Sequence, residues 1–388
     1  MIQIMEAKTK QELTKFFTFP NKLYRGNPYY VTDMIDSQVN DWLPGKNPAM
    51  EFCEGKCFLA LTDDPIVPSC GRIGNKEIVG RVAAILNHRA NEKFGKNYMI
   101  FSHIDFIDDV EVSSALFAAV EAYAAEKDCK AVHGPMGFSD MDREGMLIHG
   151  FDQLGQFYTY YNFPYYVGHM ERLGYAKEVD WVEYAVKVPE TVPENLKRIA
   201  ARARERQHLN VVDLSDKRKV PQYIRDVFTL YNEAYQVLFG MVPLTEAQIE
   251  KYVHEFLPLI SNRSAAFVYN EMNELLAFGV GGPSLAHANQ KSDGKMLPFG
   301  WFHLLRALYG KNDRWDMFLI AVRPDLKGSG LNFVVLEYLC EQAIKAGVKV
   351  AETGPQLEEN ANVLASWRMF EKEQHKRRRC WVKELTLR

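Results

Sequence analysis

The sequence predicts an α/β protein that contains two copies of one domain. A Gly-Pro pair occurs at residues 134–135 and again at 354–355, 220 residues later. Each pair follows a predicted strand, helix and strand, and each precedes a loop, a helix and a closing β segment. The length of 388 residues is enough for two domains of ordinary size. A Pro-containing linker at 189–193 separates the copies, so we expect domains over 1–189 and 190–388.

Composition narrows the class of protein further. The chain has 47% hydrophobic and 25% charged residues, which is enough to form sizeable cores. A net charge of -3 argues against a dedicated nucleic-acid binder. The chain has no apolar run of about 18 residues and no apolar core of a signal peptide, so we expect a cytoplasmic protein. The six cysteines form no CxxC pair and the histidines form no HExxH motif, so we expect reduced thiols and no metal.

In the first half, strands and helices follow in an α/β order. A helix is expected within 11–43. Val112, Leu116, Ala119 and Tyr123 recur at helical spacing, which predicts an amphipathic helix over 111–127. A loop rich in Gly and Asp extends to about residue 155, and the aromatic segment FYTYYNFPYY and a helix near 167–173 come next. Apolar runs predict the strands, at 57–61, 77–86, 98–107, 130–132 and 181–188.

The second half repeats this order around an insertion at 286–314. Strands are predicted at 265–269, 275–280 and 349–352, with a closing strand at 380–387. Helices are predicted at 194–208, 221–238, 245–257, 301–308 and 363–373, besides a nearly all-apolar helix that begins at Leu331 and is expected to be buried. The helix at 194–208 carries five basic residues. A solvated charged face is the simpler explanation for them.

The stretch RWDMFLIAVRPDLKGSGLN, residues 314–332, is the part of the second half most suited to binding a ligand. It predicts a strand that ends at Pro324, a turn at Gly328-Ser329-Gly330, and a helix from Leu331. Glycines allow the backbone to approach a ligand, and the free N–H groups of the first helical turn point the same way. Lys327 adds positive charge. The stretch therefore predicts a phosphate or pyrophosphate site, although an ordinary glycine turn is the alternative.

The first copy differs at the equivalent position. A shift of 220 residues places Asp108-Asp109-Val110 opposite the glycine turn. Two carboxylates at a helix N-terminus stabilise the helix dipole themselves and repel a pyrophosphate. We therefore expect the first copy to lack the anion site and the second copy to hold the cofactor.

The order in the second half resembles the GNAT superfamily of acyl-CoA acyltransferases. The likeness covers a strand, V-x-P, a Gly-rich turn, a helix, a strand, an acidic-Asn loop and a helix. The family turn is R/Q-x-x-G-x-G/A, whereas this chain has Asp325 at the first position. Over the whole chain, the segments FPNKLYRGNPYYV, HGPMGFSDMDREGMLIHGFD, VPLTEAQ and ETGPQLEENANVLASWRMFEK are similar to a branch of tandem-GNAT bacterial proteins that includes bacterial ceramide synthases.

This resemblance implies a fold, a co-substrate and its binding residues. The fold is two tandem GNAT-like domains, each with a mixed central sheet flanked by helices. The co-substrate is acetyl-CoA or a longer acyl-CoA, with the strand backbone along pantetheine and the turn at the pyrophosphate. Asn360 stands near the pantetheine arm in this reading, or caps the next helix. The expected cofactor-binding residues are Ile320, Ala321, Val322, Lys327, Gly328, Ser329, Gly330, Leu331, Asn332 and Asn360.

Acyl transfer to an amine needs a proton acceptor and a route for a proton to the departing thiolate. Glu352 ends the strand after the cofactor helix and is the first candidate acceptor. Glu358 and Glu359, in the next loop, are the alternatives. The superfamily often uses a tyrosine in the last helix as the acid, but this helix has none, and Ser366 is its nearest hydroxyl.

The expected activity is an acyl-CoA-dependent N-acyltransferase. Its acceptor is an amine, and the ceramide-synthase resemblance extends this to a long-chain sphingoid-type amine. Acetylation of a small polar amine and non-catalytic binding of acyl-CoA are the alternatives, and a transferase that uses aminoacyl-tRNA is a further class. The aromatic segment 157–166 and the loop around Asp140–His149 could hold the acceptor, or simply pack. Basic stretches at 197–206 and 376–379 suggest peripheral contact with the inner membrane face.

Overall fold

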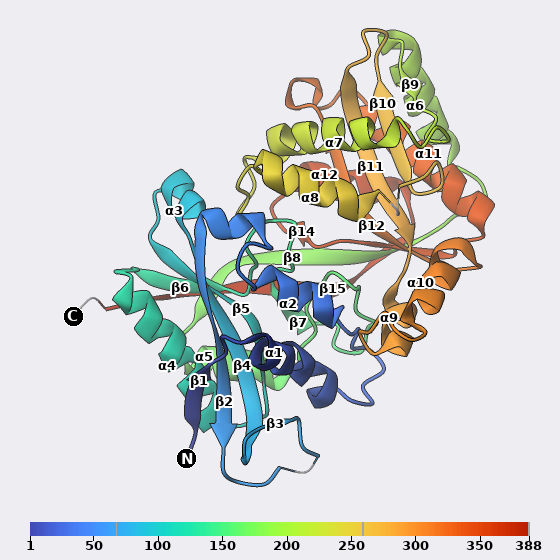
Figure 1. Ribbon diagram of the computed structural model, residues 1–388. Coiled ribbons are helices and arrows are strands. Elements are labelled where there is room, and N and C mark those ends of the chain that lie inside the picture. The colour runs from blue at the N-terminus through green and yellow to red at the C-terminus, as the bar shows by residue number, and fades with distance from the viewer. Residues whose placement is uncertain (67, 258–259, 387–388) are drawn as a thin grey trace. The chain divides into compact units, whose positions relative to one another are not determined.

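The computed structural model describes residues 1–66, 68–257 and 260–386, which form two compact units (Figure 1). Unit 1 comprises Met1–Trp181, Ala286–His303 and Lys376–Arg388. Unit 2 comprises Val182–Leu285 and Leu304–His375. The expected boundary at residue 189 therefore differs from the observed division. Residues 286–303 of the insertion expected at 286–314 belong to unit 1, as does the C-terminal segment; the sequence assigned both to the second domain.

Unit 1 contains a mixed sheet in the order β1-β2-β4-β5-β6-β15. Neighbouring strands are antiparallel except β5 and β6, which are parallel. The short strands β3 and β7 pair with β4 and β15. The strands are β1 (Gln3–Glu6), β2 (Cys53–Thr62), β3 (Arg72–Ile73), β4 (Lys76–Asn87), β5 (Tyr98–Phe106), β6 (Ala131–Gly134), β7 (Met146–His149), β8 (Ala176–Lys187), which starts in this unit, and β15 (Lys372–Glu384), which ends in it.

Helices cover both faces of this sheet because its central strands are apolar on both sides. On β2, Phe58 and Ala60 pack into the core beneath α4, whereas Leu59 and Leu61 pack beneath α1. At Gly80 a side chain would meet Leu116 Cδ1 at 2.8 Å, so the glycine allows α4 to lie close to the sheet. The helices are α1 (Lys10–Leu23), α2 (Ile35–Asp41), α3 (His88–Phe94), α4 (Val110–Glu126), α5 (Tyr165–Arg172) and α9 (Ala286–Ser292).

Unit 2 contains a second mixed sheet, in the order β8-β13-β12-β11-β10-β9. Here β12 and β13 are the parallel pair, connected through α11 just as β5 and β6 are connected through α4. The strands are β9 (Asn210–Val211), β10 (Ala265–Tyr269), β11 (Leu275–Pro283), β12 (Arg314–Val322), β13 (Val350–Thr353) and β14 (Gln356–Leu357). The helices are α6 (Glu194–Gln207), α7 (Val220–Tyr235), α8 (Glu246–Phe256), α10 (Gly300–Tyr309), α11 (Leu331–Ala346) and α12 (Ala361–Ser366).

The core of unit 2 confirms the buried helix expected from Leu331. Leu331, Val334, Val335 and Leu339 of α11 pack on the sheet and against Ala203 of α6. An added Cβ at Gly279 of β11 would lie 2.4 Å from Val335 Cγ1. The six cysteines are all free and buried, as expected. Among the helices in the described ranges, none is both long and apolar enough to cross a membrane.

The C-terminal region differs from the prediction. The expected helix at 363–373 is the six-residue α12 followed by a 3₁₀ turn, and β15 already begins at Lys372. The charged residues of this run gave no sign of a buried strand, yet Lys376 and Arg378 are only 1% exposed. The expected closing strand at 380–387 therefore starts too late, and its last residue, Leu387, lies outside the described residues.

Candidate functional site

The two parallel strands of unit 2 separate at the position where the sequence places a ligand. Their pairing runs from Arg314 opposite Val350 to Met317 opposite Thr353. Beyond this point β12 continues to Val322, while β11 still pairs with its other edge. Residues 318–322 therefore have one edge that β13 does not cover.

A β-bulge at Phe318 marks the start of this open edge. Val280 lies opposite Leu319 and Gly281 opposite Met317, so Phe318 is the additional residue on β12. Bulges re-aim the backbone and occur often beside active sites. After the bulge, Ala321 pairs with Phe278 of β11 and Arg323 donates its N–H to Leu276. Ile320 and Val322 therefore direct their N–H and C=O groups to the open edge.

A tyrosine that the sequence analysis missed stands at this edge. The Tyr235 hydroxyl, at the end of α7, lies 3.0 Å from the carbonyl oxygen of Ile320, to which it donates. The same hydroxyl lies 3.4 Å from the Ile320 nitrogen, whose N–H it accepts. A single hydroxyl thus occupies the backbone groups of the open edge at Ile320. Sequence offered no signal for this, because Tyr235 is 85 residues away and reads as an ordinary helical residue.

The expected glycine turn connects β12 to α11 through a short 3₁₀ segment, Pro324–Leu326. Gly328 and Gly330 have φ angles of +82° and +90°, which glycine adopts without strain. The first N–H groups of a helix have no intrahelical acceptor. In addition, the buried Ser329 hydroxyl has no hydrogen-bond partner among the described residues. The turn therefore offers backbone and hydroxyl donors to an anion.

Asp325, the acidic residue that departs from the GNAT pattern, is paired with a neighbouring arginine. Asp325 accepts two hydrogen bonds from Arg323, at 2.8 Å and 3.1 Å. The hydrogen bonds from Arg323 lower the pKa of the Asp325 carboxyl, so it is ionised and paired at neutral pH. Arg323 is thereby committed to Asp325, and the turn needs its positive charge from elsewhere. Lys327 is exposed and is one source.

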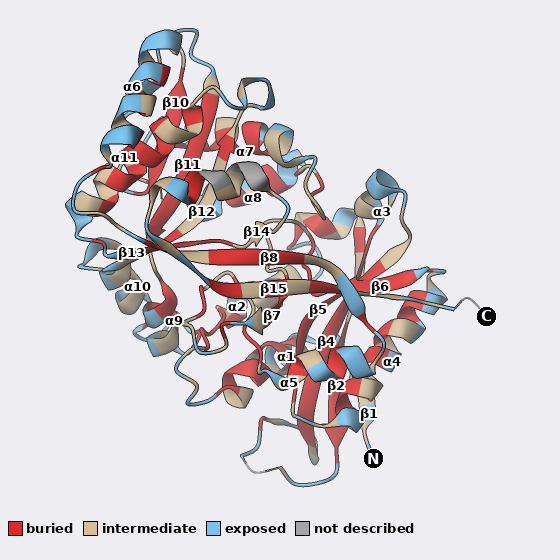
Figure 2. Ribbon diagram, turned by 180° about the vertical axis from the view of Figure 1, so that it is seen from behind, coloured by how far each residue is buried: buried red, intermediate tan, exposed pale blue. Residues whose placement is uncertain are grey.

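Helix α6, which lies beside α11 and is exposed on its outer face (Figure 2), carries further cations. An added Cβ at Gly330 would lie 3.4 Å from Ala203 Cβ and 3.6 Å from Ile199 Cγ2. On a helix, Arg202 and Arg206 lie next to this contacting face. Both are exposed, and neither has a carboxylate partner within the described part of the chain. By contrast, Arg204 is paired with Glu337 of α11.

Glu352, the first candidate proton acceptor, is buried near the point where the strands separate. Its two oxygens lie 2.6 Å from Arg314 Nη1 and 3.8 Å from His375 Nε2. Asp316, which is also buried, lies directly opposite Glu352 in the strand register. The sequence analysis predicted neither Asp316 nor His375. Asp316 is far from Glu352 in the sequence, and His375 lies within a run of charged residues. Arg314 thus binds one oxygen of Glu352, and the His375 imidazole lies beside the other.

The other predicted residues have more ordinary environments. Glu358 is partly buried and Glu359 is exposed, both in the loop before α12. Asn360 Oδ1 accepts the N–H of Val363 at 3.4 Å, which is the arrangement of a helix cap. Asn332 Nδ2 donates to the Ser366 hydroxyl at 3.0 Å, so these two side chains tie α11 to α12.

The equivalent edge in unit 1 is filled by tyrosines of the aromatic segment. The Tyr166 hydroxyl accepts the N–H of Phe106 at 2.9 Å, and Tyr165 and Tyr166 both donate to the carbonyl of Phe106. The Tyr160 hydroxyl meets Ser102. The segment therefore packs within unit 1. Asp109 caps α4, with the N–H of Glu111 at 2.7 Å, so a carboxylate stands at this helix N-terminus as expected.

The charged residues of the neighbouring loop and of β15 are also engaged inside unit 1. Arg143 forms an ion pair with Asp33. Burial, reinforced by Asp140 and Asp142, raises the pKa of Glu144. Arg377 and Arg379 both bind the buried carboxylate of Asp180, at 2.6 Å and 2.8 Å. The stretch 376–379 is therefore largely buried or ion-paired within unit 1, and its expected contact with a membrane stays a prediction.

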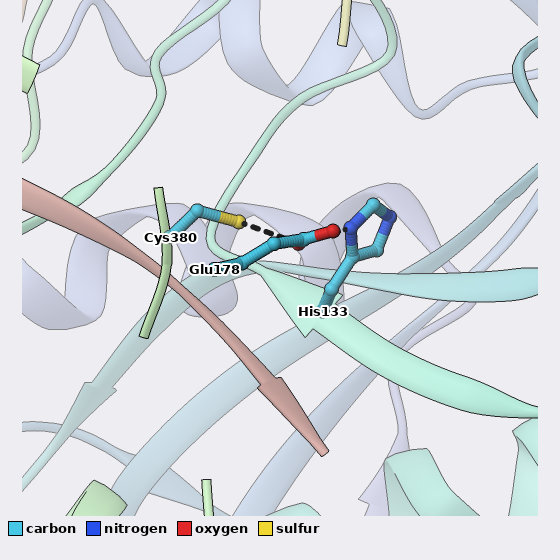
Figure 3. A group of neighbouring side chains, drawn as sticks. All are labelled: His133, Glu178 and Cys380. Carbon is cyan, nitrogen blue, oxygen red and sulfur yellow. Dashed lines mark hydrogen bonds and ion pairs between the residues drawn. The ribbon is translucent and has the colours of Figure 1, made fainter. Parts of the chain in front are cut away.

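A second cluster of chemically capable side chains lies in unit 1, where His133, Glu178 and Cys380 converge from β6, β8 and β15 (Figure 3). Glu178 Oε2 lies 2.9 Å from His133 Nδ1 and 3.5 Å from Cys380 Sγ. Lys96 Nζ holds the other oxygen at 2.8 Å. Burial raises the pKa of Cys380, whereas a metal needs a thiolate. With three donors already on the carboxylate of Glu178, the cluster fits a hydrogen-bonded, partly buried Glu better than a metal site.

Comparison with known proteins agrees with this architecture. No family model matches the sequence. Protein YghO of Escherichia coli (strain K12) is 26% identical over 382 residues, which cover 97% of this chain and 94% of YghO. A bacterial ceramide synthase of Caulobacter vibrioides is 27% identical over 310 residues, covering 78% of this chain and 76% of that protein.

The structural comparison identifies the fold. A tandem GNAT protein from the clavulanic acid biosynthesis pathway has a TM-score of 0.53 at 12% identity, with 99% of this chain and 98% of that chain covered. At this sequence identity the match shows the fold alone. The matched region includes both halves of the chain. The chain therefore has the mixed α/β fold of tandem GNAT proteins, which confirms the fold class expected from the sequence.

Proposed function

We propose that this chain is a CoA-thioester-dependent N-acyltransferase that binds the thioester in unit 2. The observation that carries the proposal is the open edge of β12, which leads directly into the glycine turn and the start of α11. An extended amide chain can pair with such an edge, and an anion can bind at such a turn. Pantetheine joined to a pyrophosphate has both features.

The individual residues divide between the parts of the co-substrate. Val322 and Ile320 offer backbone groups to the pantetheine amides, which at Ile320 displace the Tyr235 hydroxyl. Gly328, Ser329 and Gly330 receive the pyrophosphate. Arg202 and Arg206 of α6, together with Lys327, supply positive charge to the phosphates, since Arg323 is held by Asp325. Lys and Arg near a phosphate also favour its approach over longer distances.

Acyl transfer then requires two proton movements. The amine nitrogen attacks the thioester carbonyl as the C–S bond breaks, and the nitrogen loses one proton. His375, beside Glu352, accepts this proton in our scheme, because Arg314 already binds Glu352. Tyr235 stands at the open edge and donates a hydrogen bond to the thioester oxygen or the departing sulfur. The thiolate finally gains a proton from solvent or from the imidazolium.

A binding and turnover screen tests this proposal. Acetyl-, hexanoyl- and palmitoyl-CoA are titrated into the full chain, and free thiol release is followed with and without amines. We expect stabilisation by at least one thioester and amine-dependent thiol release. Stabilisation without release for any amine supports the non-catalytic alternative. Absence of both contradicts the assigned site.

For the acceptor, we propose a long-chain amine of the sphingoid type. The support is the likeness to a protein named bacterial ceramide synthase, at 27% identity. Sphinganine and polar amines such as polyamines compete in one assay with both acetyl-CoA and palmitoyl-CoA. Turnover confined to polar amines and acetyl-CoA would reject the lipid acceptor and keep the acyltransferase.

A further inference from the structure

Exposed large apolar side chains are concentrated in one short segment of the chain. Twelve large apolar residues in the described ranges are exposed, and seven of them lie within residues 296–309. Scattered exposed apolar residues are normal, but a concentration of this kind marks an interaction surface. We call this segment the apolar tip; its exposed members are Met296, Leu297, Phe299, Trp301, Phe302, Leu305 and Tyr309.

The helix in the apolar tip presents its apolar side to solvent. Trp301, Leu305 and Tyr309 of α10 follow one another at four-residue spacing, and Phe302 lies beside them on the same face. These four side chains are between 45% and 72% exposed. A helix on the surface of a globular protein normally turns its apolar stripe to the core. The orientation of α10 is therefore the reverse of the usual one.

Unpaired cations surround the apolar tip. Lys291, Lys295, Arg306 and Lys311 are all exposed, and none has a carboxylate partner among the residues that the structure describes. From residue 286 to residue 312 the sequence contains a single acid, Asp293. A second copy of this chain that bound through the same surface would bring like positive charges together, and these would repel one another. The charge pattern instead complements an anionic surface.

The residues just before the apolar tip, 289–294, form hydrogen bonds and close contacts within unit 1. Thr32 Oγ1 donates to the carbonyl of Asn289 at 2.6 Å, and Gln290 Nε2 donates to the carbonyl of Tyr30 at 2.9 Å. At Gly294 an added Cβ would lie 2.0 Å from the carbonyl oxygen of Asp33, so the backbones are in close contact there. The apolar tip therefore follows directly on a segment that is packed within unit 1.

We propose that the apolar tip docks the protein on an anionic lipid membrane. The helix would lie in the plane of the membrane, with Trp301, Phe302, Leu305 and Tyr309 at the boundary of headgroups and acyl chains. Trp and Tyr suit this boundary because they combine an apolar ring with a polar tip. The surrounding Lys and Arg side chains contact anionic headgroups. This surface does not depend on the proposed enzymatic activity.

Tryptophan fluorescence tests the proposal in the unmodified full chain. Trp301 is 45% exposed, whereas the other five tryptophans are buried or partly buried. Vesicles of phosphatidylcholine and phosphatidylglycerol in equal parts should shift the emission to shorter wavelength, and Trp301→Phe should remove that shift. An unchanged emission spectrum together with no co-sedimentation would overturn the proposal.

Variants on the same surface identify the contact. Phe302→Ser with Leu305→Ser should weaken co-sedimentation with these vesicles roughly tenfold or more. Lys295→Glu with Lys311→Glu should weaken it in the same vesicles but leave the weak binding to pure phosphatidylcholine unchanged. Val237→Ser with Met272→Ser is the matched control, since these residues are 76% and 75% exposed elsewhere. Equal losses in the control pair, or dimer dissociation without any vesicle binding, would contradict docking on lipid.

Discussion

Units 1 and 2 contain the same strand–helix–strand arrangement but treat its open edge differently. In unit 1 the edge of β5 beyond its pairing with β6 is filled by Tyr160, Tyr165 and Tyr166. In unit 2 the corresponding edge of β12 meets the single hydroxyl of Tyr235 at Ile320. One fold thus holds a closed edge that stabilises its unit and an edge that remains suited to a ligand.

The N-terminus of the helix that follows each open edge also differs between the two units. Asp109 caps α4 with its carboxylate, and Asp108 lies 3.0 Å from His169. Gly330 precedes α11 and brings no side chain. A carboxylate at a helix start satisfies its donors internally, whereas glycine leaves them for an external anion. We therefore propose that the two units share one fold while only unit 2 binds the co-substrate.

The largest expected effect comes from placing a carboxylate in the unit 2 turn, as in unit 1. Gly328→Asp should reduce acyl-CoA affinity by about a hundredfold or more, since two like charges then share the turn. Isothermal titration calorimetry measures this directly. Gly328→Asn is the matched control, because Asn and Asp both tolerate the positive φ of +82° there. Equal affinity for the Asp and Asn variants would reject the site.

Glu352 and Glu178 each lie beside a histidine, and substituting them one at a time distinguishes an effect on catalysis from an effect on stability. Glu352→Gln in unit 2 should lower kcat about 10²-fold, because it disturbs the group beside the proton acceptor. Glu178→Gln in unit 1 should leave kcat for folded protein unchanged. Steady-state kinetics of both variants, with the acyl-CoA affinity measured in parallel, decides the matter. A full kcat for Glu352→Gln would remove this residue from the mechanism.

The pH dependence of stability should report Glu178. Burial alone would raise its pKa, but hydrogen bonds from His133 and Lys96 outweigh burial and lower the pKa from 4.5 to about 2. The lowered pKa contributes roughly 3 kcal/mol of stability that is present above pH 4.5 and lost as the pH falls toward 2. Urea unfolding between pH 5 and pH 3 should show this loss, and Glu178→Gln should flatten it. An equal slope in both proteins would contradict the assignment.

Removing one hydroxyl from each edge sharpens the comparison. Tyr166→Phe should lower the free energy of unfolding by about 1–3 kcal/mol, because the buried Phe106 N–H then loses its acceptor. Tyr235→Phe should cost less stability and lower kcat with little change in acyl-CoA affinity. Chemical denaturation and kinetics on both variants test the pair. If Tyr166→Phe lowered kcat and Tyr235→Phe lowered the free energy of unfolding instead, the structural and the ligand-binding edge would have been assigned the wrong way round.

The smallest expected effect concerns the cations of α6. Arg202→Gln with Arg206→Gln should weaken CoA binding roughly tenfold and reduce its salt dependence. Dephospho-CoA should lose less affinity than CoA, since it has fewer phosphate charges to bind. Arg263→Gln, an exposed arginine elsewhere in unit 2, is the control. Unchanged affinity in the double variant would leave the turn and Lys327 as the only source of binding.

Local signals in the sequence predicted the strands, the glycine turn and α11, because each depends on neighbouring residues. They also singled out Glu352, which ends a strand beside that helix; its catalytic role stays a prediction. The positions of Tyr235 and His375 beside the candidate site were missed for one reason. These positions depend on contacts between distant segments, such as the 85 residues that separate Tyr235 from Ile320. The charged run at 372–379 misled for the same reason, because its partner Asp180 is nearly 200 residues away.

The stoichiometry of CoA binding tests the central claim most directly. Titration of CoA into the full chain, followed by a structure of the complex, counts the molecules bound and locates them. We predict one CoA per chain, along the edge of β12 with its pyrophosphate at Gly328–Gly330. A second CoA along β5, or a single CoA bound there in place of β12, would contradict the account.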